Sequence, residues 1–569
     1  GLMTGDVPLT AVQQWFFDAC QVDQHHFNYA VMLEWPLQID VEILRGALSA
    51  LLQHHDMLRV VYAPAGNGLV QTIGAGQQAD LQVCMLPTGD AAQQPLLQKA
   101  NEVQASFDLQ SGPLFKAVVF RDETGIDPDQ LLLVVHHLLV DGISWRILME
   151  DLEIAYKQVL AGEKLKLTEK TASFQLWANT LSEYVGQQFP EQQIAYWNSI
   201  SEASRALPGF LPDQPDEENR ISDASVLSFL LSVEETNALL HQANQAYHTE
   251  INDLLLTALS RALHASFGAD AYSITLEGHG REQVVDLDIS RTIGWFTSIF
   301  PFILSHHSEA GRHLQEVKEA LRKVPNKGVG FGLLRYLADM KSLQGASQIS
   351  FNYLGSFDQF GGNSDSLFRF SNAEVGDSSS PRVSRLHEVD VLGMMTGGQL
   401  RISISYSAKR MAAARMESLI AEYHNALRSL IEHCVSVEKG RLSPADFSGC
   451  GMDMAEYDQF LAHHHLNASS IEDIYPLSAL QEGMLFEWML NPDSPAYFVQ
   501  LEINLGNSVD VGLLKNAWQQ LIKRHAILRT AFFNEHTGAA QRPLQVVFKE
   551  MPLSFEEIDL RSMDEQAQE

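Results

Sequence analysis

Residues 131–145 read LLLVVHHLLVDGISW. The all-apolar run Leu131–Val135 predicts a strand that is buried on both faces. From Trp145 onward, apolar residues recur at helical spacing, which predicts a helix. His136 and His137 stand between the two, at the carboxyl end of the strand, and an Asp-Gly pair turns the chain into the helix. This order indicates an α/β fold, in which strand ends hold side chains rigidly where loops open to substrate.

The segments that follow alternate between strand and helix patterns. Strands are predicted at Val226–Leu231, Tyr272–Leu276, Ser298–Leu304, Gln348–Tyr353 and Gln399–Tyr406. Helices are predicted at Glu234–Ala246, Ile251–Ser266, Leu314–Lys323 and Ala412–Cys434. The stretch Leu207–Asp223 is rich in Pro, Asp and Glu and predicts a surface loop. We therefore expect two α/β lobes that meet near residues 180–220.

Composition and charge exclude several classes of protein. The chain has 569 residues, with 39 Lys and Arg against 71 Asp and Glu, for a net charge of −32. Such a negative field repels nucleic acid and anionic membranes. No apolar run is long enough to span a bilayer, and no signal peptide is visible. The four cysteines have no metal-site or disulfide spacing, so we expect reduced thiols and a cytoplasmic location: Cys20, Cys84, Cys434 and Cys450.

The start of the chain is repeated near its end. PLTAVQQWF at residues 8–16 corresponds to PLSALQEGM at 476–484, and HHDMLRVVY at 54–62 corresponds to RHAILRTAF at 524–532. Each copy predicts a helix that begins with a capping box, and each predicts a strand after that helix. The two capping boxes are Thr10 with Gln13 and Ser478 with Gln481. The two predicted strands are Tyr29–Leu37 and Tyr497–Leu505. The repeat indicates one full unit and the opening of a second.

Five motifs, in order, give this sequence a resemblance to a known family. The pattern HHxxxDG resembles the active-site signature of the condensation-domain superfamily of non-ribosomal peptide synthetases. Within it, several segments resemble the epimerization domain: DGISW at 141–145, LEGHGRE at 276–282, RTIGWFTSIFP at 291–301, PNKGVGFG at 325–332 and FNYLGSFD at 351–358. The resemblance covers about residues 7–447, and residues 471–569 resemble the opening of a condensation domain. One departure is Phe331, where the family usually has Tyr.

The resemblance implies an α/β fold with two chloramphenicol-acetyltransferase-like lobes, which form a V-shaped pseudo-dimer around a channel. The expected parts are an N-terminal lobe at 1–190, a C-terminal lobe at 191–447, a linker at 448–470 and an incomplete second domain at 471–569. The linker contains three consecutive histidines, which we interpret as solvated rather than metal-binding. The signature of the second domain itself would fall near position 607 by the repeat offset, beyond Glu569.

The implied activity is inversion at the α-carbon of an aminoacyl or peptidyl thioester in antibiotic or secondary-metabolite biosynthesis. His137 and Glu277 are the candidate acid/base residues, because burial brings a carboxyl pKa toward neutrality and histidine titrates there unaided. Either each works one face of the α-carbon, or Glu277 works both while an imidazolium binds the enolate. The supporting candidates are His136, Asp141, Gly142, Ser144, Arg291, Asn352 and Tyr353. Asp141 is expected to pair with Arg291, with Arg281 as the second choice.

Partners and cofactors follow from the same resemblance. The chain needs no cofactor or metal of its own, since phosphopantetheine arrives on an upstream peptidyl carrier protein, and a downstream condensation domain would select the D form. Two other functions remain open: a condensation domain that forms a peptide bond, and a non-catalytic module that docks carrier proteins. The sequence does not distinguish aminoacyl from peptidyl substrates.

Overall fold

The computed structural model describes residues 2–36, 38–66, 68–76, 78–124, 127–187, 189–343, 347–356, 366–437, 440–492, 494–505, 509–534 and 542–562. Contacts divide the chain into two compact units. The first comprises 1–239, 254–308 and 323–431, and the second comprises 240–253, 309–322 and 432–569. No helix within the described ranges is both long and apolar enough to cross a membrane.

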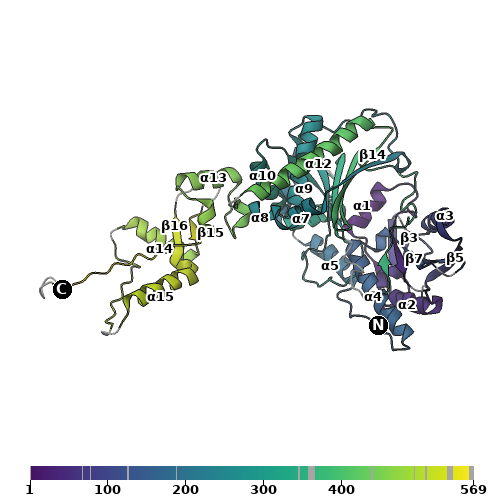
Figure 1. Cartoon of the computed structure of the whole chain (residues 1–569), viewed down its shortest axis with the longest axis horizontal. Coiled ribbons are helices and arrows are strands. Elements are labelled where there is room, and N and C mark those ends of the chain that lie inside the picture. Colours follow the sequence, from purple (N-terminus) through teal and green to yellow (C-terminus); the bar gives the residue numbers. More distant parts are fainter. Residues whose placement is uncertain are drawn as a thin grey trace. The chain divides into compact units, whose positions relative to one another are not determined.

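A five-stranded sheet forms the first layer of the first unit (Figure 1). Its strands, in spatial order, are β12 (Arg369–Phe370), β2 (Asn28–Trp35), β7 (Asp129–His136), β6 (Phe115–Asp122) and β5 (Asp80–Leu86). The predicted strand Leu131–Val135 lies within β7, where none of its five side chains is more than 1 % exposed. The chain therefore places the two histidines at the end of a fully buried central strand, as the sequence predicts.

The part of the chain that forms most of the five-stranded sheet also contains helices and a small second sheet. The helices are α1 (Ala11–Ala19), α2 (Val41–His54), α3 (Gln93–Gln104), α4 (Gly142–Leu160) and α5 (Phe174–Gly186). The small antiparallel sheet has the order β1 (Gly5–Val7), β4 (Gly68–Ile73) and β3 (Val60–Ala65). The predicted capping box at the start of α1 is present, with the Thr10 N–H donating to Gln13 Oε1 at 3.0 Å.

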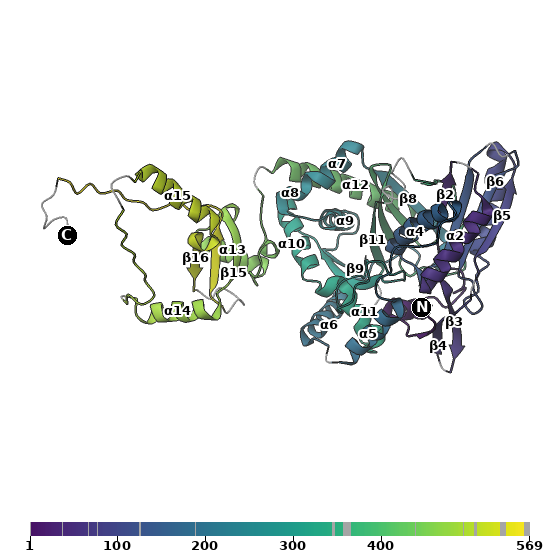
Figure 2. The same ribbon diagram turned by 90° about the horizontal axis from the view of Figure 1, so that it is seen from below.

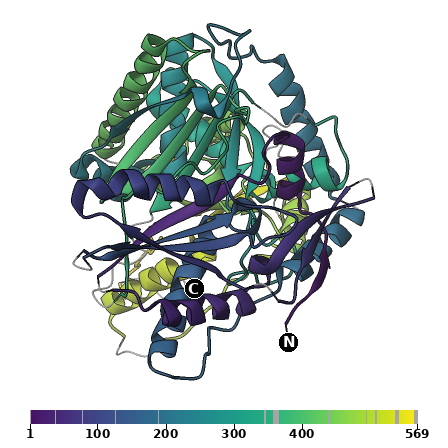
Figure 3. The same cartoon turned by 90° about the vertical axis from the view of Figure 1, so that its right-hand side faces the viewer.

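A six-stranded mixed sheet forms the second layer (Figure 3). Its order is β10 (Ser298–Ser305), β9 (Ala271–Gly278), β11 (Ile349–Ser356), β13 (Val389–Thr396), β14 (Gln399–Ser407) and β8 (Ala224–Leu230). Nearby helices are α6 (Glu191–Ala206), α7 (Val233–His241), α9 (Ile251–Phe267), α11 (Val329–Gly332) and α12 (Ala413–Ser436). Helices α7, α9 and α12 lie to one side of this sheet (Figure 2). The α/β prediction is confirmed; β13 is a strand that the sequence reading missed.

The five-stranded and the six-stranded sheet both belong to the first compact unit. The short strand β12 follows strands of the six-stranded sheet in sequence, but it pairs with β2 of the five-stranded sheet. The predicted lobe boundary at residues 190 and 191 therefore stays a prediction. The predicted loop Leu207–Asp223 holds no strand or α-helix, only a 3-10 turn at its end.

The second unit contains the second copy of the repeated sequence. Its elements are α8 (Ala243–Tyr247), α10 (Ala310–Arg322), α13 (Met454–His463), β15 (Ile471–Pro476), α14 (Ala479–Leu490), α15 (Val511–Arg524), β16 (Thr530–Phe533) and β17 (Leu544–Phe548). The small sheet β15-β17-β16 repeats the antiparallel order of β1-β4-β3. Ser478 and Gln481 form the second predicted capping box, with the Ser478 N–H donating to Gln481 Oε1 at 2.9 Å.

The interpretation of the segment 448–470 holds for two of its histidines but not for its whole length, because His463 and His465 are exposed whereas other side chains of the segment are buried. This segment contains α13, whose Tyr457 and Phe460 pack in one core with Ile474 and Val546 of the small sheet. Burial of these aromatic rings offsets the entropy of ordering the segment. The segment is therefore part of the fold of the second unit.

The predicted strand at Tyr497–Leu505 is also wrong, because this stretch carries no strand. Its counterpart β2 is held between β7 and β12, both of which come later in the chain. Among the described residues, no strand pairs with the stretch at 497–505, and its apolar side chains are exposed, as Val499 and Leu501 are.

Candidate active site

The first histidine of the signature is structural in its contacts. His136 ends β7 and is fully buried. Its Nε2 donates to the Gln24 carbonyl oxygen at 2.9 Å, and its Nδ1 accepts from the Leu138 N–H at 3.3 Å. Burial lowers the pKa of His136 to about 3. Both ring nitrogens are thus occupied within the protein, and a neutral His136 supports the turn that presents the next residue.

The second histidine lies among aromatic rings. The His137 ring stacks on Phe27 at a centroid distance of 5.2 Å, lies 4.6 Å from Trp295, and has Tyr29 edge-on at 5.5 Å. The backbone N–H of His137 donates to the Phe27 carbonyl oxygen at 2.9 Å. Burial lowers the pKa of His137, so its imidazole is neutral at neutral pH. The rings fix the imidazole in place and keep it in the form that accepts a proton.

Asp141 ties this turn to the loop that follows β9. It caps α4, which begins at Gly142, by accepting from the Ser144 N–H at 2.7 Å. Arg281 Nη2 donates to both Asp141 oxygens, at 3.1 and 3.3 Å. Ser144 Oγ donates to the Gly294 carbonyl oxygen at 2.9 Å. The signature therefore orients the loop through buried, charge-assisted hydrogen bonds.

The partner of Asp141 is Arg281, and the first choice, Arg291, is wrong. Arg291 donates instead to Glu150 and Asp151, each at 2.9 Å, one helix turn or more beyond the cap of α4. Both arginines follow β9, and the sequence spacing alone does not separate them. Arg281 is the nearer to the strand end, and it reaches the cap directly.

The Asp141–Arg281 pair gives a stability prediction. Each side chain is only 7 % exposed. Removing one partner leaves the other charge buried without compensation, so Asp141→Ala should lower the free energy of unfolding by roughly 3–5 kcal/mol. Glu150→Gln breaks a pair whose carboxylate is 49 % exposed, and it should cost less than about 1 kcal/mol. Urea unfolding of both variants tests the pair; similar losses would contradict its structural role.

Glu277 lies near the end of β9 and is held by its neighbour on β11. Asn352 Nδ2 donates to Glu277 Oε2 at 2.7 Å. The Glu277 side chain is exposed to solvent. Partial loss of hydration to the surrounding protein, followed by the charge of Asp390, raises the pKa of Glu277 to about 7. Asp390 is itself held by Ser350 at 2.6 Å and by Arg385 at 2.7 Å.

Tyr353 does not share the face of Glu277. Side chains alternate along a strand, so Tyr353 points away from the face that carries Asn352. It packs on Gly393 of β13, where an added Cβ would stand 3.0 Å from the tyrosine ring. Tyr353 therefore lies on the face of β11 opposite Asn352, and its supporting role stays a prediction. The last two residues of the FNYLGSFD motif, Phe357 and Asp358, lie outside the described residues.

The loop after β9 passes against the segment after Arg291. Gly280 has φ +67°, and a Cβ there would stand 1.6 Å from the Phe296 carbonyl oxygen, so only glycine fits. The Arg281 guanidinium lies over the Phe296 ring, 4.0 Å from its centroid. His279 is half exposed and pairs with Glu282 at 3.1 Å. The spacing of LEGHGRE thus serves the turn that follows Glu277.

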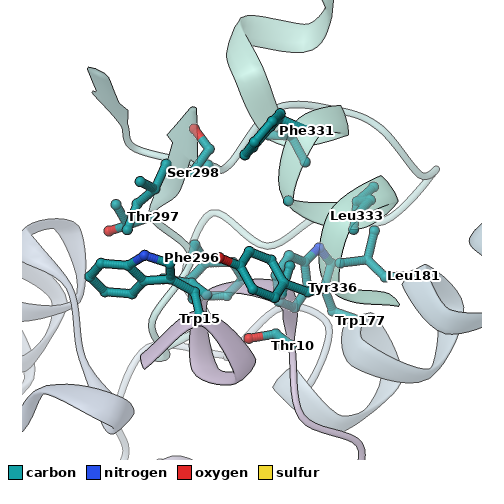
Figure 4. Close-up of a pocket in the computed structure, with 16 residues that line it drawn as sticks. Thr10, Trp15, Trp177, Leu181, Phe296, Thr297, Ser298, Phe331, Leu333 and Tyr336 are labelled. Atoms are coloured by element: carbon teal, nitrogen blue, oxygen red, sulfur yellow. The ribbon is translucent and has the colours of Figure 1, made fainter. Parts of the chain in front are cut away.

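A mostly apolar cavity of about 40 Å³ adjoins these segments (Figure 4). Its walls come from α1, α5, the start of β10 and α11, and include Trp15, Trp177, Phe296, Phe331, Leu333 and Tyr336. Phe331, the departure from the family pattern, is 1 % exposed and packs edge-on against Trp197 at 5.3 Å. A hydroxyl is not needed at that buried contact.

One cluster of potential metal ligands occurs among the described residues: His54, His55 and Asp151. Asp151 already accepts from His55 Nε2 at 2.8 Å and from Arg291 at 2.9 Å. The arginine charge beside the carboxylate disfavours a cation there. These residues therefore form an ion-pair network around Asp151 of α4 rather than a metal site.

Three residues of the site were not selected from the sequence. Phe27 and Trp295 flank His137, and Asp390 shifts the pKa of Glu277. Trp295 lies in the RTIGWFTSIFP motif, but an indole side chain in a motif does not by itself indicate contact with a catalytic histidine. Asp390 lies on β13, a strand whose short alternation around Gly393 gave no clear pattern.

Comparison with known proteins agrees with this fold. A family model described as a condensation domain matches residues 3–446 and again residues 471–569. A polypeptide of mycosubtilin synthase from Bacillus subtilis is 38 % identical over 99 % of this chain, and bacitracin synthase 3 of Bacillus licheniformis is 37 % identical over 98 %. The chain spans only 22 % and 9 % of the length of these two relatives.

Solved structures show the same architecture. The epimerization domain from the third module of tyrocidine synthetase B has a TM-score of 0.70 and 34 % identity, over 77 % of this chain and 99 % of that one. The condensation domain of the Monacolin K polyketide synthase MokA, at 17 % identity, has a TM-score of 0.62 over 76 % and 98 % of the two chains. The predicted α/β fold with chloramphenicol-acetyltransferase-like lobes is confirmed, and this chain belongs to the condensation-domain family of non-ribosomal peptide synthetases.

Proposed function

We propose that residues 3–446 invert the α-carbon of an aminoacyl or peptidyl thioester, which a carrier protein presents on its phosphopantetheine arm. The observation that carries this proposal is the Glu277 carboxyl, whose pKa is raised to about 7 and whose Oε2 accepts from Asn352. A carboxyl group with such a pKa exchanges protons readily near neutral pH. The likeness to the tyrocidine synthetase epimerization domain and the LEGHGRE motif support the same reaction.

The proposed reaction needs one proton on the two groups together. Burial lowers the pKa of His137, and partial desolvation raises that of Glu277 to about 7, so the form with a neutral His137 and a protonated Glu277 is well populated near neutral pH. From this state, the His137 imidazole takes the α-proton, and the electron pair of the C–H bond moves into an enolate of the thioester. The Glu277 carboxyl then gives its proton to the opposite face of the carbon. The reverse reaction uses the same groups with their roles exchanged.

This assignment of the proton weighs against the alternative in which an imidazolium binds the enolate and Glu277 works both faces. That alternative needs an imidazolium at His137 before the substrate reacts, which its burial disfavours, whereas the proposed steps form the imidazolium only after the α-proton is taken. Asn352 orients the Glu277 carboxyl, and the rings of Phe27 and Trp295 orient His137. Proposed roles for the other residues are structural: His136 supports the turn, while Asp141, Gly142 and Ser144 hold the loop.

The shared proton gives a pH prediction. The productive form carries one proton on the pair, so kcat/KM should fall as pH rises above about 7, where Glu277 loses it. On the acid side, kcat/KM should fall only below the ordinary range of histidine, because the pKa of His137 is lowered. Inversion rates across the range from mildly acidic to mildly alkaline pH test this. A rate that instead rises through neutral pH to a plateau would mean that the Glu277 carboxylate alone is the base.

Product analysis tests the reaction class. The full chain, incubated with a carrier domain loaded with an L-aminoacyl or L-peptidyl group, should give a D/L mixture of the same acyl group after hydrolysis. If a second loaded carrier yields a longer peptide instead, the chain is a condensation catalyst. If the carrier binds and its acyl group stays L, the chain is a docking module.

A mixture of isomers fits the repeat at the end of the chain. Two configurations at one carbon differ little in energy, so inversion alone gives comparable amounts of each. Selection of the D form would need a downstream domain. Residues 471–569 match the same family model as the first unit, which supports a following condensation domain as the proposed partner.

A further inference from the structure

We propose that the substrate is a peptidyl rather than an aminoacyl thioester, and that the open face of the six-stranded sheet binds its peptide chain. This inference rests on the proposed function, because it places the inverted carbon at Glu277. It concerns the side of the sheet opposite α7, α9 and α12 (Figure 2).

A straight row of side chains leads from Glu277 across the sheet. The hydrogen bond from Asn352 joins Glu277 to β11. The strand register then pairs Asn352 with Leu392, Leu392 with Ser403, and Ser403 with Ser228 on the edge strand β8. Paired residues point to the same face. The row is therefore one surface that starts at the candidate acid/base group and ends at the edge of the sheet.

This face is exposed toward the edge strand β8, whereas Thr275 and Ser350, beside the row on β9 and β11, are buried. In the row, Leu392 is 37 % exposed, and at the edge strand Val226 is 60 % and Leu230 is 43 % exposed. Their neighbours on the other face, Ile402 and Ile404, are fully buried. Val226 and Leu230 flank the end of the row at Ser228, while Leu392 lies within it, so three exposed apolar side chains gather on this one face, as at many binding surfaces.

The chemistry of the row fits a peptide. Asn352, Ser403 and Ser228 offer amide and hydroxyl groups that can pair with peptide N–H and C=O groups. Leu392 lies between them and offers contact to apolar side chains. Asp390 lies beside the row, but its charge is paired with Arg385 at 2.7 Å. Arg401, which pairs with Leu230 in register, adds one exposed cation at the side of the row. The row itself is uncharged beyond Glu277 and suits an extended peptide backbone.

The length of the row favours a peptide over a single residue. From β9 to β8 there are four steps between neighbouring strands, roughly 19 Å at the usual strand spacing. An extended peptide needs about five to six residues to cover that span. A single aminoacyl group with its α-carbon at Glu277 would leave most of the row without a contact.

The test compares two substrates on the same carrier domain: L-phenylalanyl, and a pentapeptidyl group of apolar residues that ends in L-phenylalanine. Wild-type protein should invert the peptidyl group with a kcat/KM at least about tenfold higher. Leu392→Asn, which removes the apolar contact without adding a charge near Glu277, should lower the peptidyl value by about tenfold or more and leave the aminoacyl value within about twofold. Leu230→Asn, farther along the face, provides a second variant if Leu392→Asn does not fold.

The control is Leu211→Asn, because Leu211 is 72 % exposed and lies in a loop outside the sheet. It should change neither value. Equal rates for both substrates, or equal losses for both in the Leu392 and Leu230 variants, would overturn the peptide surface while leaving inversion intact. If neither substrate is inverted by wild-type protein, the proposed function fails, and this inference fails with it.

Discussion

Glu277→Gln should lower the rate of inversion about 10⁴-fold, at the upper end of what a positioned acid/base group contributes. The amide keeps the shape of the side chain, and its oxygen can still accept from Asn352, which lies 2.7 Å from the wild-type carboxylate. It can neither take nor give a proton near neutral pH. The measurement is chiral analysis of the carrier-bound acyl group, starting separately from the L and the D form.

The same variant should separate proton exchange from inversion. If His137 works one face by itself, Glu277→Gln should still exchange the α-proton of one isomer with solvent deuterium and return it with the same configuration. The other isomer should not exchange. Exchange and inversion at wild-type rates from both isomers would remove Glu277 from the mechanism.

Two controls accompany Glu277→Gln. Glu282→Gln alters a carboxylate in the same loop, which pairs with His279 at 3.1 Å, and it should change the rate less than threefold. Stability supplies the second control. The folded-state pKa of Glu277, about 7, exceeds its unfolded value of about 4.3, so its ionisation opposes folding as pH rises between these values. Glu277→Gln should therefore be at least as stable as wild type above the folded-state pKa and equal to it below the unfolded value.

His137→Gln should lower the rate of inversion by roughly 10²–10⁴-fold, because it removes the second proton carrier. Glutamine fills part of the space between Phe27 and Trp295, which lie 5.2 and 4.6 Å from the imidazole, and so limits the damage to packing. This variant should exchange the α-proton of only one isomer, the one that Glu277→Gln does not exchange. Mirror-image patterns in the two variants would identify the face that each group serves.

The control for His137 is His279→Gln, a half-exposed histidine directly after the strand that carries Glu277. It should leave the rate unchanged within about twofold. A change below threefold in His137→Gln would make His137 a scaffold residue, and residual exchange from both isomers would return the reaction to Glu277 alone. Circular dichroism of both variants checks that the fold is kept.

Much of the fold was predictable where the sequence has regular periodicity. The buried strand β7 and helix α4 follow from Leu131–Val135 and the apolar spacing after Trp145. The edge and central strands β8, β9 and β14 likewise carry clear patterns. Short elements were not predictable: β13 has little alternation to detect, and the helix in 454–463 forms because its aromatic rings meet a sheet that comes later in the chain.

The site was predictable by residue type but not by pairing. The motifs point to His137, Glu277 and Asn352, and the structure places Asn352 on Glu277. The arginine that pairs with Asp141 could be identified only from the structure, because Arg281 and Arg291 both follow β9 and only their contacts distinguish them. The face of Tyr353 depends on the register of β11, which a strand pattern alone leaves open.

The pKa of Glu277 has the same origin in tertiary structure. Its sequence neighbours are glycine and leucine, and neither explains a value of about 7. The shift comes from packing around the strand end and from Asp390, two strands away in the sheet and more than a hundred residues away in sequence.

Deuterium incorporation at the α-carbon tests the central claim most directly. The full chain is incubated in D₂O with carrier domains loaded separately with the L and the D acyl group, and the hydrolysed product is analysed by mass spectrometry and chiral chromatography. The proposed mechanism predicts that each starting isomer yields the opposite isomer with one deuterium at the α-carbon, and that the acyl chain keeps its length. An unlabelled acyl group of unchanged configuration from both carriers would contradict it.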